Sequence, residues 1–236
     1  GEELAALLGK ECPAFFARGD RVYYHGIGLL HRARGGKEDK KGLIREAVGV
    51  LEKVPLSLDL EAIVPQLALS GEWAAIVALT AQRARALDPL NVGLDRASPA
   101  GEEARRRRQE GAYVYFEALL DLVLGADRTP AASLAALASS LSDEARASAG
   151  AALVDAGLSS EDALLHERVF EALLRSPQRD CVPASASPHL EGFLIRGGGL
   201  AGVSQDSSPT LASSAQLERV RCLARMYVHR SQFAAA

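Results

Sequence analysis

The stretch SGEWAAIVALTAQRARALDP, Ser70 to Pro89, contains the only tryptophan of a chain of 236 residues. Its apolar and small side chains recur at intervals of three and four residues, which is typical of one face of an α-helix. These positions are Trp73, Ile76, Val77, Thr80, Ala81, Ala84 and Leu87. Ser70 stands where an N-cap would be, and Pro89 cannot continue a helix. We therefore predict a helix here, with Trp73 buried against a neighbouring helix rather than stacked on a ligand.

The same helical spacing recurs along the chain between short polar or proline-containing segments. The stripes run through residues 22–33, 43–54, 60–69, 102–124, 163–174 and 217–230, with two alanine-rich segments between 129 and 157. Alternating strand patterns bounded by Asn-Gly or Asp-Gly turns are absent from the sequence. The expected fold is all-α, with roughly nine to eleven helices in antiparallel succession that pack as a bundle or an open solenoid.

Several local features follow from the same pattern. Pro65 is expected to kink or shift its helix, since its ring removes an N–H and crowds the preceding turn. The segment Ser159 to Asp162 opens a helix with a capping-box-like Ser and Asp. Two segments rich in Gly, Ser or charge, 35–42 and 196–214, are expected to be flexible loops. We predict that residues 1–236 form one helical segment, packed as a bundle or as a solenoid.

Composition excludes several classes of protein. A formal charge of −3 and a pI near 6.0 provide no net attraction to DNA, RNA or an acidic membrane. The cysteines Cys12, Cys181 and Cys222 lack the spacing of a zinc site or a disulfide framework, which favours reduced thiols in the cytoplasm or nucleus. No apolar run approaches the roughly 20 residues of a membrane span. Because the chain has no initiator Met at Gly1 and ends inside a helical pattern, we expect a piece of a longer protein.

Two glycine motifs resemble dinucleotide-binding fingerprints. The run GGGLAG, Gly197 to Gly202, matches G-x-G-x-x-G, and Glu218 stands about where a ribose-binding acid would be. That fingerprint requires a preceding strand, a helix directly after it and a parallel sheet, and the sequence predicts none of these. GIGLLH, Gly26 to His31, lies within a helical stripe. We interpret the first as a flexible loop and the second as part of a helix.

The charged and histidine motifs also favour structural interpretations. ARRRRQE, Ala104 to Glu110, is interpreted as the solvated start of a helix that offers at most a modest basic face to an acidic partner. LHER, Leu165 to Arg168, begins like a zinc signature, but Phe170 occupies the second ligand position. The other histidines are scattered: His25, His31, His189 and His229. We predict no catalytic, cofactor-binding or metal-ligating residue and no enzymatic activity.

The order of several segments is similar to that in a known family. CPAFFARGDRVYYHGIGLLHRAR (Cys12 to Arg34) and the segment Leu58 to Pro89 resemble the C-terminal helical half of the large inner-ring nucleoporins, the 155-kilodalton family of animals and its 170-kilodalton fungal counterpart. The later segments Leu158 to Leu174, Ser187 to Arg196 and Leu223 to Ala236 are similar to helices of that family in the same order.

The resemblance implies an α-helical solenoid of antiparallel helix pairs that acts as a structural scaffold in the inner ring of the nuclear pore complex, at the nuclear envelope. Its expected partners are other nucleoporins, above all short segments of flexible linker nucleoporins, and it would thereby support nucleocytoplasmic transport. In the family, membrane contact belongs to a β-propeller outside this segment. No cofactor and no direct contact with nucleic acid are expected.

The sequence also departs from the family. The segment Leu124 to Gly157 is unusually rich in alanine, and Pro177 to Ala186 carries two prolines where the family has a leucine-rich helix, so we expect an irregular structure there. Two alternatives remain open at this point. One is an α-solenoid adaptor of a vesicle-coat or proteasome-scaffold type, and the other is an all-helical enzyme or a nucleotide binder through Gly197 to Gly202.

Overall fold

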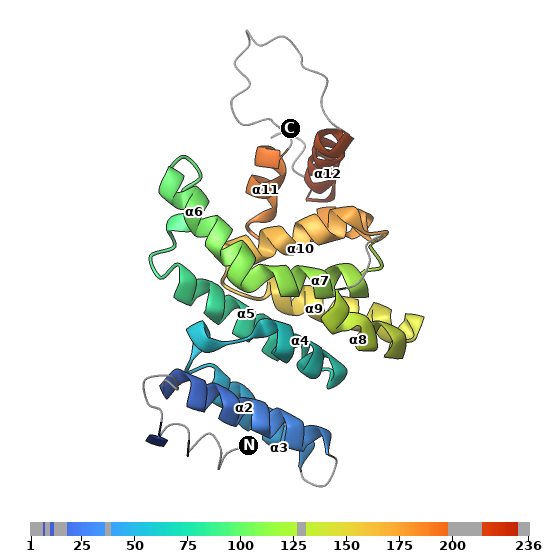
Figure 1. Ribbon diagram of the computed structural model, residues 1–236. Coiled ribbons are helices and arrows are strands. Elements are labelled where there is room, and N and C mark those ends of the chain that lie inside the picture. Colours follow the sequence, from blue (N-terminus) through green and yellow to red (C-terminus); the bar gives the residue numbers. More distant parts are fainter. Residues whose placement is uncertain are drawn as a thin grey trace. The chain divides into compact units, whose positions relative to one another are not determined.

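The structure, a computed structural model, describes residues 18–35, 39–126, 131–197 and 214–230, together with Leu7, Lys10 and Glu11. Within these ranges the chain forms α-helices, short 3-10 helices and one π-helical stretch, and it forms no strand (Figure 1). The α-helices are α2 (Arg18–Arg34), α3 (Lys40–Leu51), α4 (Leu60–Leu69), α5 (Trp73–Leu87), α6 (Pro99–Arg108), α7 (Val114–Val123), α8 (Ala135–Ser140), α9 (Asp143–Leu158), α10 (Ala163–Arg175), α11 (Leu190–Gly197) and α12 (Ser214–His229). The all-α prediction is confirmed.

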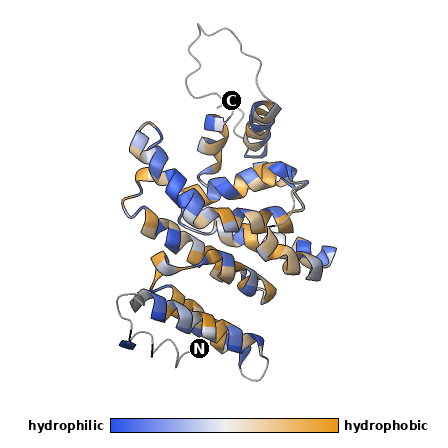
Figure 2. Cartoon of the chain, in the orientation of Figure 1, coloured by the Kyte–Doolittle hydropathy of each residue, from blue (hydrophilic) through white to orange (hydrophobic). Residues whose placement is uncertain are grey.

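The helices group into two compact units. The first comprises Gly1–Leu119 with Pro130–Ala145, and the second comprises Leu120–Thr129 with Arg146–Ala236. Figure 2 shows that most helices carry both apolar and polar residues, as expected for helices that bury one face and expose the other. Each unit therefore has an apolar core of its own.

In the first unit, α2 and α3 pack closely as an antiparallel pair (Figure 1). Gly26 of α2 permits this approach, because a Cβ atom there would lie 2.7 Å from the side chain of Leu51 on α3. Leu51 and Ala47 are fully buried in the same interface. GIGLLH is thus helical, as predicted, and its first glycine has a packing role.

The helix predicted from Ser70 to Pro89 is present as α5, but it begins later than expected. Its N-cap is Glu72, which makes no side-chain capping bond, whereas Ser70 is the C-cap of α4. Trp73 is consequently the first residue of α5, where its side chain is only half-buried. The predicted cap and the predicted deep burial of Trp73 are both wrong. The core of this helix is formed further along by Ile76 and Leu79.

The segment predicted as one long helix from Glu102 to Leu124 is divided. α6 is capped by Ser98, whose hydroxyl accepts from the Gly101 N–H at 3.0 Å. A π-helical stretch, Gln109–Tyr113, then separates α6 from α7. Such an insertion adds one residue to a turn and shifts which face is buried. The Arg83 side chain donates to the Gly111 carbonyl in this stretch, and thereby ties α5 to it.

In the second unit, α10 contributes much of the core, where Phe170 is fully buried and its ring centroid lies 5.4 Å from that of Phe193 on α11. Asp162 is the N-cap of α10 and accepts from the Leu164 and Leu165 N–H groups, so the helix begins after the predicted capping box and Ser159 does not cap it. Ion pairs connect the elements of this unit. They include Arg175 with Asp121 at 3.1 Å and Arg196 with Glu167 at 2.6 Å.

The segments that we predicted to be irregular are partly helical in the structure. Helix α3 already begins at Lys40, so the end of the predicted loop 35–42 is helical, and residues 36–38 lie outside the described part. Helix α11 extends to Gly197, so the first two residues of the predicted loop 196–214 are helical. Residues 198–213 lie outside the described part of the chain. The doubted helix between 177 and 186 is a 3-10 helix, Arg179–Ala184, with Pro183 inside it. Pro65 lies within α4, which continues through it.

Candidate functional site

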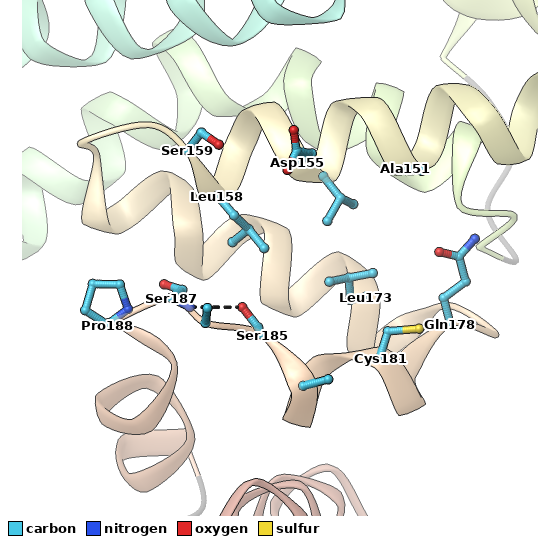
Figure 3. A pocket seen from close by; sticks show the side chains of 13 residues that line it. Ala151, Asp155, Leu158, Ser159, Leu173, Gln178, Cys181, Ser185, Ser187 and Pro188 are labelled. Carbon is cyan, nitrogen blue, oxygen red and sulfur yellow. Dashed lines mark hydrogen bonds between the residues drawn. The ribbon is translucent and has the colours of Figure 1, made fainter. Parts of the chain in front are cut away.

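The second unit contains a groove of about 560 Å³ between α9 and the segment that connects α10 to α11 (Figure 3). We name it the α9–η5 groove, where η5 is the 3-10 helix Arg179–Ala184. Its lining residues are Ala151, Val154, Asp155, Leu158, Ser159, Leu173, Gln178, Cys181, Ala184, Ser185, Ala186, Ser187 and Pro188. A volume in this range is typical of sites that hold a small ligand or part of a peptide.

One wall of the groove is a single face of α9. Ala151, Asp155 and Ser159 follow each other at intervals of four residues, and Val154 and Leu158 do the same beside them. Residues four apart lie on one side of a helix, so the wall combines a small and polar row with an apolar row. Leu173 of α10 contributes to the apolar lining. The groove is therefore largely apolar, with a few polar groups.

His166 on α10 joins the two sides of the groove. Its side chain is buried, at 2% exposure. Nε2 lies 2.8 Å from the Ser160 carbonyl oxygen, and Nδ1 lies 2.8 Å from the Ser187 hydroxyl. Because a carbonyl can only accept, Nε2 carries the proton and Nδ1 accepts from Ser187 in the neutral ring. The ring thus connects the α9–α10 turn to the wall that precedes α11.

The surroundings of His166 favour its neutral form. Burial lowers its pKa from the ordinary value, and the nearby His189 lowers it too. The bond to the Ser160 carbonyl and the charge of Asp162 act in the opposite direction. The Ser187 hydroxyl additionally accepts from the His189 N–H at 3.2 Å. The wall from Ser185 to Pro188 is thus held by several hydrogen bonds and does not depend on one contact.

The glycine motif does not form a nucleotide site in the described residues. Gly197 is the last residue of helix α11, so a helix precedes the motif where a dinucleotide fingerprint requires a strand. Residues 198–202 lie outside the described ranges. Glu218 lies on α12 and pairs with Arg221 at 3.7 Å.

The arginine run has a different role from the predicted one. It lies at the end of α6 rather than at the start of a helix, and Arg108 is buried, with its guanidinium 3.4 Å from Asp88 and 2.8 Å from the Tyr113 hydroxyl. Arg106 is exposed and pairs with Glu103 at 2.6 Å. The expectation of a wholly solvated run is therefore wrong, because one of the four arginines belongs to the core.

The remaining candidate groups are engaged in packing. In LHER, Glu167 binds Arg196 and His166 binds the groove walls. Cys181 and Cys222 are free thiols, and burial raises the pKa of Cys222. Over the described ranges, no three His, Cys, Asp or Glu side chains gather as they would around a metal ion. None of the helices described is both long and apolar enough to cross a membrane.

Sequence reasoning missed the pairing of His166 with Ser187, which are 21 residues apart. One signal was present, since His166 lies between Leu165 and Val169 on the apolar face of its helix. A polar ring on such a face requires a partner. The sequence could not say which of the distant serines supplied it.

The described residues form helices and no strand, so the protein belongs to the all-α class. The C-terminal model of the nucleoporin family described as non-repetitive/WGA-negative matches residues 2–236 of the chain. The chain therefore belongs to this nucleoporin family, which assigns it to the nuclear pore complex at the nuclear envelope.

Among solved structures, the chain is similar to the C-terminal domain of Nup170 from Chaetomium thermophilum, crystallised as a methionine-substituted mutant. The TM-score is 0.63 at 19% identity, and the match covers 93% of this chain and 38% of that chain. This likeness supports the α-solenoid fold. The chain thus spans well under half the length of the structure that it matches. The predicted family and fold class are both confirmed.

Proposed function

We propose that this chain is part of a structural scaffold of the inner ring of the nuclear pore complex, which binds other nucleoporins through its helical surfaces and so supports nucleocytoplasmic transport. The observation that carries the proposal is the family match over residues 2–236. The fold shared with the C-terminal domain of Nup170 supports it.

The use of polar side chains favours a structural role over catalysis. Arg108 and Asp88 bind each other inside the first unit, and Arg83 donates to backbone carbonyls of Pro55 and Leu56 at 3.0 and 3.1 Å. His166 likewise joins two segments. These groups hold backbone elements together, as expected of a scaffold whose function depends on its shape.

The proposed partners are short segments of flexible linker nucleoporins, together with neighbours in the inner ring. Grooves between helices accept apolar or helical peptides, and many weak contacts gain strength through avidity in a symmetric ring. The α9–η5 groove is our candidate for one such contact. We assign any membrane contact of the full-length protein to a part outside this chain, and we expect no direct binding of nucleic acid at a charge of −3.

An adaptor of a vesicle-coat or proteasome-scaffold type would share the architecture, but the family match favours the nucleoporin. The test is a titration of the purified chain with purified linker nucleoporins, followed by calorimetry. We expect saturable binding of at least one linker nucleoporin at low ionic strength. A chain that binds none of them, while a coat or proteasome subunit binds it, would contradict the proposal.

A further inference from the structure

We propose that the α9–η5 groove is a preformed site for a short segment of another protein that carries a lysine or arginine, which pairs with Asp155, next to small apolar side chains. The inference rests on the proposed function, because it specifies the chemistry of a partner of the scaffold. It is carried by three features of the groove: its fixed walls, its polar groups and its single charge.

The walls are fixed before any partner binds. His166 connects the Ser160 carbonyl to the Ser187 hydroxyl, each at 2.8 Å, across the end of the groove. The Ser187 N–H also donates to the Ser185 hydroxyl at 3.3 Å, a bond drawn in Figure 3. A site that is already ordered loses less conformational entropy on binding than one that must be assembled. The groove is thus suited to bind a partner without rearrangement.

The polar groups of the groove suit a peptide backbone. Within the described residues, the side chains of Ser159 and Gln178 have no hydrogen-bond partner, and both line the groove with Leu158 and Leu173. A peptide presents N–H and C=O groups between its side chains, so it can use the hydroxyl and the amide while its apolar side chains contact the leucines.

Charge determines which peptide is favoured. Asp155 is the only charged residue among those that line the groove, and its carboxylate is exposed without an ion-pair partner in the described part of the chain. An acidic segment would be repelled there, whereas a lysine or arginine gains a partner at the rim. Polar and charged contacts of this kind provide specificity more than affinity.

The test begins with short overlapping peptides that tile the flexible linker nucleoporins, titrated into the purified chain by fluorescence anisotropy. We expect the peptides that bind to contain a basic residue, and we expect Asp155→Asn to weaken them by up to about fivefold. Asp155→Lys should weaken them by about tenfold or more, because it replaces attraction by repulsion. Glu144→Lys, at another exposed acid on α9 that does not line the groove, is the matched control and should change affinity little.

Two further variants complete the design. Ala151→Trp fills the groove from an exposed position on α9 and should abolish binding while the thermal unfolding of the chain is unchanged. Exchanging the basic residue of the peptide for aspartate should restore affinity for Asp155→Lys, as a charge swap across one contact requires. If neither Asp155→Lys nor Ala151→Trp affects any bound peptide, the inference is overturned although the scaffold proposal stands. If no linker nucleoporin binds the chain at all, the proposed function itself fails.

Discussion

Arg108 and Asp88 form a buried ion pair at the centre of the first unit. Their side chains are each 3% exposed, and the guanidinium Nη1 lies 3.4 Å from the carboxylate Oδ2. Asp88 also accepts from the Val92 and Gly93 N–H groups, at 2.8 and 2.9 Å, so it ends α5 and holds the following turn at the same time. The end of α5, which Pro89 marks in the sequence, is therefore coupled to an arginine of the next helix.

The first prediction concerns this pair. Asp88→Ala removes the carboxylate that pairs with the buried Arg108 and leaves the Val92 and Gly93 N–H groups without their acceptor, which should lower the free energy of unfolding by about 3–5 kcal/mol. Urea unfolding followed by circular dichroism measures the change. Glu103→Ala removes the exposed partner of Arg106 and serves as the control, with an expected loss of at most about 1 kcal/mol. Equal losses for the two variants would mean that the buried pair is not desolvated.

The second prediction concerns Trp73, which is half-buried at the first position of α5. Trp73→Ala should lower the free energy of unfolding by about 1–3 kcal/mol, less than expected for an aromatic ring enclosed on all sides. Phe116→Ala, at a fully buried position, should cost about 3–5 kcal/mol. Acrylamide should quench the tryptophan fluorescence of the native chain partially, and complete protection from quenching would show that the ring is buried.

The third prediction concerns two glycines of α2. Gly26→Ala places a methyl group 2.7 Å from the buried side chain of Leu51, so this side chain or the helix that carries it must shift, and we expect a loss of about 1–3 kcal/mol. Gly28 has open space around its Cβ position. Gly28→Ala should therefore stabilise the chain by about 0.5–1 kcal/mol through the better helix propensity of alanine. Thermal unfolding of both variants measures these changes in stability. A Gly26→Ala variant that is more stable than the native chain would contradict the close packing of α2 and α3.

The fourth prediction is a pH dependence that arises from His166. Its folded-state pKa is depressed below the unfolded value of about 6.5, so the unfolded chain binds the proton more readily. Stability from this group is then complete above about pH 6.5 and is lost as pH falls from there towards the folded-state pKa. Unfolding at pH 7.5 and 5.5 should show the loss in the native chain and a smaller loss in His166→Gln. An NMR titration in which the ring titrates at or above 6.5 would refute the assignment.

The elements that the sequence predicted well are those with a strong helical period. α5 and α10 were found with nearly correct ends, because Pro89 and Asp162 are local signals that act on their own backbone. The predicted start of α5 was wrong because either Ser70 or Glu72 could serve as the N-cap of α5 in the short turn after α4. Ser70 has the better capping side chain, but it is used to end α4.

The α9–η5 groove lay beyond sequence reasoning for a different reason. Its lining comes from α9, α10 and a 3-10 helix that contains Pro183, and only packing brings these elements together. The burial of Arg108 was likewise missed, since a run of four arginines gives no indication of which one faces the core. A π-helical turn directly after Arg108 sets that register, and no sequence signal marked it.

The central claim is that this chain is an inner-ring scaffold segment that binds other nucleoporins. Crosslinking of intact nuclear pore complexes, followed by mass spectrometry, tests it most directly. The account predicts crosslinks from the exposed lysines Lys40, Lys41 and Lys53 to inner-ring neighbours or linker nucleoporins. Crosslinks confined to vesicle-coat or proteasome subunits, with none to an inner-ring component, would contradict it.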